Sequence, residues 1–222
     1  LWDMESGALH GLLPNHQSIW AVAFSADGAT VACSGARRLI RLWQVASGEN
    51  FLTLHGHNNW VTALAFSPTK SILASGSGDQ AVYLWDTQSG ELLTALHGHA
   101  AWVYSLAFSP RGDWLASGSA DKQICLWDMA RHQLLRTLHG HSDAVRAVTF
   151  APATNADPQA SALVLVSGSS DESIRVWDPQ TGQCLDILHA GRPYEDMKLN
   201  GVTGITAAQR AALQALGARA DE

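Results

Sequence analysis

Three sets of histidine, serine, aspartate and tryptophan recur along this chain with nearly the same spacing. Successive members are 18, 4 and 6 residues apart in two sets and 26, 4 and 6 apart in the third. A serine, a histidine and an aspartate could serve as the nucleophile, general base and orienting carboxylate of a hydrolase. An active site is needed only once, however, so the periodic recurrence favours a structural role. The sets are His57, Ser75, Asp79 and Trp85; His99, Ser117, Asp121 and Trp127; and His141, Ser167, Asp171 and Trp177.

Paired histidines suggest a second kind of chemistry, the binding of a metal ion. His55, His97 and His139 each lie two residues before a histidine of one of the three sets. A zinc site needs four converging ligands, and the cysteines lie elsewhere in the repeat. We therefore expect these three histidines to be solvated residues at strand ends, and we predict no metal and no other cofactor.

The spacing reflects an internal repeat that runs through most of the chain. Four phenylalanines, at 24, 66, 108 and 150, are 42 residues apart, and four tryptophans, at 43, 85, 127 and 177, are separated by 42, 42 and 50. The eight additional residues of the last interval lie around ATNADPQA, between Phe150 and Ser167, which indicates an insertion in a polar loop. Trp2 lies 41 residues before Trp43 and belongs to the same series.

Each period contains short segments that favour β-strands. In one period these segments are WVTALAFS (60–67), SILASGS (71–77), AVYLWD (81–86) and ELLTALH (91–97), separated by turn residues. Four short strands joined by tight turns predict an antiparallel meander. A single sheet of this kind cannot bury both faces, whereas a ring of such sheets can.

The period resembles the WD repeat, which has Gly-His near its start and Trp-Asp near its end. Gly-His occurs at 56–57, 98–99 and 140–141, and Trp-Asp at 2–3, 85–86, 127–128 and 177–178. The resemblance covers residues 1–189 and implies an all-β fold, a β-propeller with one four-stranded antiparallel blade per repeat. We expect an incomplete ring, with further blades before residue 1. Its parts are the remnant of a preceding blade (1–13) and full repeats at about 14–54, 55–96, 97–138 and 139–189.

The resemblance also implies a role for each repeated residue. In WD repeats the tryptophan, serine, histidine and aspartate form a buried hydrogen-bonded chain within the blade. The loop after Gly-His and the turn that carries the aspartate lie together on one end of the propeller, here called the top face, which often binds partners. Trp60 and Trp102 could be binding residues there or could pack between blades, and the sequence leaves both open. The candidate partner-binding residues are Asn58, Asn59, Trp60, Ala101, Trp102, Ala120, Ser142, Asp143 and Ser170.

The first full repeat departs from the pattern. The positions of the four network residues hold Asn15, Cys33, Arg37 and Trp43, with His16 one residue out of register. An unpaired charge is costly to bury, so we expect Arg37 to point outward. The cluster of Arg37, Arg38 and Arg41 could bind an acidic or phosphate group, although an exposed strand face is the simpler interpretation. We predict that this blade is the least stable of the four.

The tail, residues 190–222, lacks the repeat. Thr206 and Gln209 match a capping box and predict a short helix over about 207–216, which is too short to be stable alone. The tail resembles the ending of bacterial multidomain proteins in which an NTPase of the NACHT or NB-ARC-like type precedes WD repeats. That resemblance implies an NTPase domain upstream and a role in signal transduction.

Composition excludes several other classes of protein. The 222 residues carry a net charge of −6, which argues against binding to nucleic acid through electrostatics. No apolar run reaches the roughly 18 residues of a membrane span, and no secretory signal is evident. Three cysteines do not form a disulfide framework, so we expect reduced thiols and a cytoplasmic location.

The function that these features favour is a non-catalytic scaffold for protein–protein interaction, or a ligand-sensing module, in the regulatory C-terminal part of a larger protein. Its partner would be a protein or peptide, including upstream domains of the same polypeptide. The alternatives are a purely architectural segment and, less favoured, an enzyme with a site in the propeller channel. We also expect the 222 residues alone to be poorly stable, or to associate through the open ends of the ring.

Overall fold

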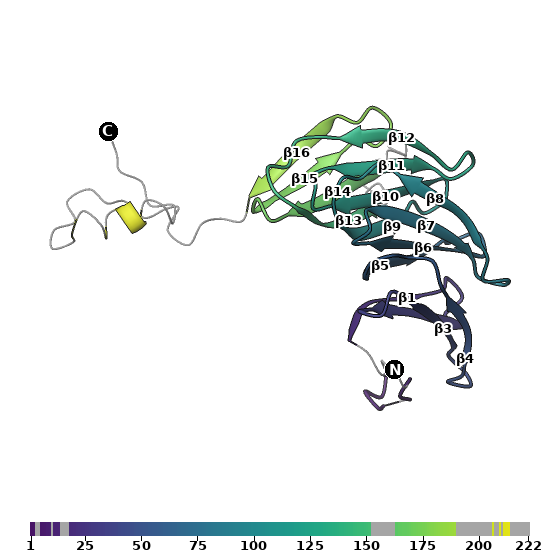
Figure 1. Ribbon diagram of the computed structural model, residues 1–222. Coiled ribbons are helices and arrows are strands. Elements are labelled where there is room, and N and C mark those ends of the chain that lie inside the picture. The colour runs from purple at the N-terminus through teal and green to yellow at the C-terminus, as the bar shows by residue number, and fades with distance from the viewer. Residues whose placement is uncertain are drawn as a thin grey trace. The chain divides into compact units, whose positions relative to one another are not determined.

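The computed structural model describes residues 1–2, 5–9, 11–13, 18–151, 163–189, 206, 209 and 211–213. Its sixteen strands form four antiparallel sheets of four strands each, and within each sheet the strands are neighbours in chain order (Figure 1). Sheet 1 contains β1 (Ile19–Phe24), β2 (Thr30–Gly35), β3 (Ile40–Gln44) and β4 (Asn50–Leu54), and sheet 2 contains β5 (Val61–Phe66), β6 (Ile72–Ser77), β7 (Ala81–Asp86) and β8 (Leu92–His97). Sheet 3 contains β9 (Val103–Phe108), β10 (Trp114–Ser119), β11 (Ile124–Asp128) and β12 (Gln133–Leu138), and sheet 4 contains β13 (Val145–Ala151), β14 (Val164–Ser169), β15 (Ser173–Trp177) and β16 (Cys184–His189). The predicted all-β fold, an incomplete propeller of four-stranded blades, is confirmed.

In sheets 2, 3 and 4 the aspartate of the Trp-Asp pair caps the turn that follows the third strand. Asp86 Oδ1 accepts hydrogen bonds from the backbone N–H groups of Gln88 and Ser89, at 2.9 and 2.7 Å. Gly90 then adopts a φ of 79°, a left-handed conformation that glycine adopts without strain. The chain thereby reverses into the outermost strand, and Asp128 and Asp178 cap the equivalent turns of sheets 3 and 4.

Neighbouring sheets pack face to face through three apolar cores. The innermost strands β1, β5, β9 and β13 lie beside one another in that order. In each core the sheet that comes later in the chain contributes a fully buried tryptophan, namely Trp85, Trp127 or Trp177. These indoles are large apolar groups, so their burial accounts for much of the contact between successive blades.

Hydrogen bonds and glycines bring the sheets close together. Ser34 Oγ of β2 donates to the carbonyl of Val61 in β5 at 3.2 Å, and Thr62 Oγ1 donates to the carbonyl of Val103 in β9. A β-carbon at Gly76 would lie only 2.6 Å from Cγ1 of Val103 in the next sheet. At Gly168 of sheet 4, by contrast, a β-carbon would meet none of the described residues within 4 Å.

Other parts of the chain are described only in part. Trp2 and Leu9 form an isolated antiparallel bridge, whereas Asn15, His16 and the predicted insertion near 152–162 lie outside the described residues. The chain divides into two compact units, Leu1–Ile187 and Leu188–Glu222. In the second unit, Thr206 and Gln209 form reciprocal capping hydrogen bonds, at 2.9 and 3.2 Å. Residues 209 and 211–213 are helical, and the rest of the predicted helix over 207–216 lies outside the described residues.

Candidate functional site

The structure brings the four repeated side chains of sheet 2 together in one hydrogen-bonded chain. Nε1 of Trp85 donates to Oγ of Ser75 at 2.8 Å, and that hydroxyl lies 2.7 Å from Nε2 of His57. Nδ1 of His57 lies 2.9 Å from Oδ2 of Asp79. The hydrogen bonds therefore link Trp85 in the third strand to Ser75 in the second strand, and Ser75 to His57 in the loop before the first strand. His57 in turn contacts Asp79 in the turn after the second strand.

Sheets 3 and 4 contain the same arrangement with nearly the same distances. In sheet 3 all three contacts are 2.8 Å, and in sheet 4 they are 2.8, 2.7 and 2.9 Å. The 26-residue interval in the third set therefore leaves the geometry unchanged. The residues of these two chains are Trp127, Ser117, His99 and Asp121 in sheet 3, and Trp177, Ser167, His141 and Asp171 in sheet 4.

The protonation pattern of the network follows from the donors at its two ends. The indole N–H of Trp85 can only donate, so Ser75 accepts from it and donates its own hydrogen to Nε2 of His57. Nδ1 of His57 then carries the hydrogen that is donated to the Asp79 carboxylate. Burial raises the pKa of Asp79, but hydrogen bonds from His57 and from the backbone N–H groups of Asn58 and Ala81 outweigh burial and hold the pKa at about 2. Each polar side-chain group of this four-residue network has a hydrogen-bond partner, as a stabilising buried network requires.

The burial of the network is inconsistent with nucleophilic catalysis. Ser75 is completely buried and His57 is only 6% exposed, so a substrate cannot reach the hydroxyl. That hydroxyl is also committed as an acceptor to Trp85 and as a donor to His57. Its geometry suits a tie between strands, which is the role that the WD-repeat resemblance implies.

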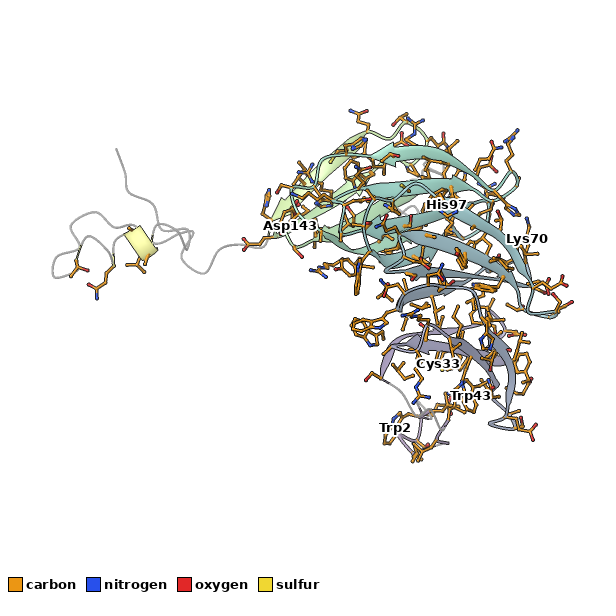
Figure 2. The ribbon with its side chains drawn as sticks, in the orientation of Figure 1. Trp2, Cys33, Trp43, Lys70, His97 and Asp143 are labelled. Carbon is orange, nitrogen blue, oxygen red and sulfur yellow. The ribbon has the colours of Figure 1, made fainter. Side chains whose placement is uncertain are left out.

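Sheet 1 has a different arrangement at the equivalent positions. Trp43 Nε1 lies 3.3 Å from Sγ of Cys33, and the two side chains are neighbours on this sheet (Figure 2). Arg37, which takes the place of the aspartate, is exposed, as the cost of burying an unpaired charge leads one to expect. Arg38 is also exposed, whereas Arg41 is half-buried and has an interaction partner.

The loops of the top face are joined by the network aspartates and by backbone hydrogen bonds. Asp79 Oδ2 accepts from the N–H of Asn58, and the N–H of Gly78 donates to the carbonyl of Trp60, both at 2.9 Å. The equivalent backbone bonds link Ala120 to Trp102 and Ser170 to Ala144. Asp143 of the top face and Lys70, in the turn between β5 and β6, lie at opposite ends of the sheets (Figure 2).

Large side chains on the top face form a continuous row across all four sheets. The ring centroids of Trp20 and Trp60 are 4.9 Å apart, those of Trp60 and Trp102 are 5.8 Å apart, and those of Trp102 and Tyr104 are 6.4 Å apart. The guanidinium carbon of Arg146 lies 4.3 Å from the centroid of the Tyr104 ring. We call these five residues the aromatic row.

A β-bulge near the start of each innermost strand coincides with three of the five residues of the row. The register with the second strand shifts between Ile19 and Ala21 in sheet 1, and at the equivalent place in sheets 2, 3 and 4. A bulge redirects the side chain of its extra residue. The residues at the shifts are Trp20, Thr62, Tyr104 and Arg146, and three of these four belong to the aromatic row.

The other candidate residues of the top face differ in accessibility. Trp60 is 37% exposed, while Trp102 is half-buried against Gly78 of the preceding sheet. These two tryptophans therefore contact each other between sheets and also present surface to solvent. Among the remaining candidates Asn58, Ser142, Asp143 and Ser170 are exposed, and Asn59, Ala101 and Ala120 are half-buried.

The paired histidines are placed as solvent-facing residues. His55, His97 and His139 are exposed, and each lies at or next to the end of an outermost strand. Among the described residues, no group of three or more His, Cys, Asp or Glu side chains could hold a metal ion.

Comparison with known proteins identifies the family. The sequence profile of the WD40 family (WD domain, G-beta repeat) matches residues 7–44, 48–86, 90–128 and 132–178. These matches cover most of the chain, which therefore belongs to the WD40 repeat family. Each match after the first begins near the outermost strand of one sheet and ends with the third strand of the next, so repeats and sheets are offset by one strand.

Two bacterial relatives match short parts of the chain. An uncharacterized WD repeat-containing protein, alr3466, from Nostoc sp. is 43% identical over 44 residues, which is 20% of this chain and 3% of that protein. The probable serine/threonine-protein kinase PkwA from Thermomonospora curvata is 42% identical over 50 residues, which is 22% of this chain and 7% of the kinase. The matched stretches thus span only a small fraction of either relative.

Membership in the family carries a general function. WD40 repeats generally mediate protein–protein interactions, with proteins or peptides as partners, and WD40 repeat domains are typically non-catalytic. In the part of the chain that the structure describes, no helix is long and apolar enough to cross a membrane.

Proposed function

We propose that this chain is a protein-binding module whose top face holds its partner through the aromatic row. The observation that carries the proposal is the unbroken contact from Trp20 through Trp60 and Trp102 to Tyr104, with Arg146 at its end. Tryptophan, tyrosine and arginine are the residue types most enriched among the hot spots of protein interfaces.

The exposure of the row supports a role in binding in addition to packing. Trp20 is 47% exposed and Trp60 is 37% exposed, although both rings already contact a neighbouring ring. Contacts among the rings limit their rotamer freedom, so little side-chain entropy is lost when a partner covers them. A partner therefore meets a broad apolar surface that is ordered before binding.

We propose further that the module is the regulatory part of a longer cytoplasmic signalling protein. The kinase of Thermomonospora curvata contains a similar stretch, and the tail resembles proteins in which an NTPase domain precedes WD repeats. The partner is a protein or peptide, including other domains of the same polypeptide. An intramolecular partner would hold an enzyme domain inactive until a competing target occupies the top face.

The principal alternative is a purely architectural role, in which the row only packs sheets together. This alternative predicts that removing the row leaves partner binding unchanged. The enzyme alternative has less support, because the three Ser-His-Asp sets are buried and periodic.

Affinity capture with matched variants separates the binding role from the architectural one. The test variant combines Asn59→Ala, Trp60→Ala and Trp102→Ala, and the control is Trp2→Ala, a 68% exposed tryptophan outside the row. Captured proteins are quantified by isotope-labelled mass spectrometry after circular dichroism has shown that each variant is folded. We expect a partner that the wild type and the control retain and the triple variant loses. Equal recovery with all three proteins would favour the architectural role.

A further inference from the structure

We infer that the occupant of the aromatic row is an acidic peptide segment, one that places apolar side chains on the rings and carboxylates beside sheet 1. The inference rests on the proposed function and adds the chemical class of the partner. Its basis is the placement of charge around Trp20 and Trp60.

Trp20 of sheet 1 contacts Trp60 at the start of sheet 2. Trp20 is more exposed than Trp60, and Trp102 and Tyr104 are half-buried. Trp20 and Trp60 therefore offer apolar surface to a partner where the loops of sheets 1 and 2 meet. Chemical selectivity depends on the polar groups around these two rings.

The turn next to Trp20 is cationic, which distinguishes it from the corresponding turns of the other sheets. Arg37 and Arg38 are exposed there, whereas the equivalent turns begin with Asp79, Asp121 or Asp171. The N–H of Ala36 donates to the carbonyl of Ser18 at 3.3 Å, which joins this turn to the segment leading into Trp20. Arg37 thus takes the place of the carboxylate, and together with Arg38 it gives the turn beside Trp20 two exposed guanidinium groups.

The remaining charges near the row do not cancel this cationic end. Asn58 and Asn59, between the turn and Trp60, are neutral. Both carboxylate oxygens of Asp79 accept hydrogen bonds, from His57, Asn58 and Ala81. The exposed carboxylates of the top face, Asp143 and Glu172, belong to sheet 4 at the opposite end of the row, beside Arg146 and its hydrogen bond to Ser170.

This distribution favours one class of ligand. A basic peptide could contact indole faces through cation–π interactions, but Arg37 and Arg38 would repel it. A carboxylate beside an apolar residue satisfies both features, because guanidinium groups bind carboxylates with bidentate geometry. A single-stranded nucleic acid could also stack on the rings, but the net charge of −6 on the chain opposes it.

Defined peptides test the charge requirement. The probes are three fluorescein-labelled dodecapeptides that share a core of tryptophan, leucine and proline and carry four glutamates, four serines or four lysines at one end. Fluorescence anisotropy with the 222-residue chain should rank them glutamate, serine, lysine, with about a tenfold higher affinity for the glutamate peptide than for the serine peptide. A twelve-nucleotide oligothymidylate serves as a fourth probe.

Two double variants assign the effect to the cationic turn. Arg37→Glu with Arg38→Glu should abolish the preference for glutamate, whereas Lys70→Glu with Arg111→Glu makes the same charge change at the opposite end of the sheets and should leave it intact. Equal binding of the three peptides, tighter binding of the oligonucleotide, or absence of binding by every probe would overturn the inference. Loss of peptide binding in Trp20→Ala, combined with equal affinities for the three peptides in the wild type, would uphold the proposed function and reject only the acidic ligand.

Discussion

In sheet 1 the sulfur of Cys33 lies 3.3 Å from the indole nitrogen of Trp43, whereas each of the other three sheets places a serine hydroxyl 2.8 Å from its tryptophan. A thiol is a weaker acceptor than a hydroxyl, and no aspartate occupies the turn of sheet 1 to anchor a histidine. The side-chain tie that joins the strands is therefore weaker in sheet 1 than in sheets 2 to 4.

The first prediction concerns the local stability of sheet 1. Because its strands have the weaker tie, backbone amides of β2 and β3 should exchange with deuterium faster than those of β6, β7, β10 and β11. Hydrogen–deuterium exchange followed by mass spectrometry resolves these segments. Protection of residues 15–55 equal to that of residues 57–139 would contradict the prediction.

The second prediction concerns the free energy of unfolding contributed by the network. Ser75→Ala leaves the buried indole N–H of Trp85 and Nε2 of His57 without their partner, so it should destabilise the chain by roughly 1–3 kcal/mol. Urea denaturation monitored by tryptophan fluorescence measures the change. Ser71→Ala, at an exposed serine four residues earlier, is the matched control and should have little effect. A change no larger than that of the control would show that the network contributes little stability.

The third prediction is a loss of stability in acid. The pKa of Asp79 is lowered from 3.8 to about 2, and the pKa values of Asp121 and Asp171 are also lowered. A carboxylate whose pKa is lower in the folded state than in the unfolded state stabilises the fold. This stabilisation is complete at pH values above the unfolded-state pKa, and it is lost as the pH falls through the folded-state pKa. Unfolding free energy should therefore decline between about pH 4 and pH 2, by about 2 kcal/mol for Asp79.

A substitution isolates the contribution of Asp79 to that decline. Asp79→Asn cannot titrate, so its unfolding free energy should be lower than that of the wild type at pH 6 and should fall less steeply below pH 4. Denaturation curves at a series of pH values measure both quantities. Parallel pH profiles for the variant and the wild type would contradict the assigned pKa shift.

The fourth prediction concerns contact between sheets. The β-carbon of Gly76→Ala would lie 2.6 Å from Val103, and that of Gly118→Ala would lie 2.7 Å from Val145. The first substitution therefore forces sheets 2 and 3 slightly apart, and the second does the same to sheets 3 and 4. Overpacking of this kind should cost about 1–3 kcal/mol. Gly168→Ala, at the equivalent position and with no other described residue within 4 Å of the new β-carbon, should be close to neutral. Equal thermal stability of the three variants would argue against the close approach of the sheets.

The repeat predicted the fold well because hydrophobic alternation and turn residues are local features of the sequence. The segments expected at 71–77 and 81–86 correspond to β6 (Ile72–Ser77) and β7 (Ala81–Asp86) within one residue. The side chains of His57, Ser75, Asp79 and Trp85 recur at regular spacing, and the resemblance to WD repeats implied that they form one hydrogen-bonded network.

The aromatic row could not be predicted in the same way. Trp20 and Tyr104 are two residues out of register with Trp60 and Trp102, and they lie at the bulges of β1 and β9. The bulges recur at one position of the repeat, but spacing alone does not show that a strand is bulged or which rings of neighbouring sheets touch. Trp60 and Trp102 share one position in the repeat, and this spacing made them candidates from the sequence.

Photocrosslinking from the row is the most direct test of binding at the top face. p-Benzoylphenylalanine would replace Trp60 in one protein and Trp114, a half-buried tryptophan at the opposite end of sheet 3, in another. If the row binds the partner, irradiation in a lysate should yield a specific crosslinked protein from position 60 and none from position 114, and Trp20→Ala should abolish it. Crosslinking of the same protein from both positions, or from position 114 alone, would contradict binding at the top face.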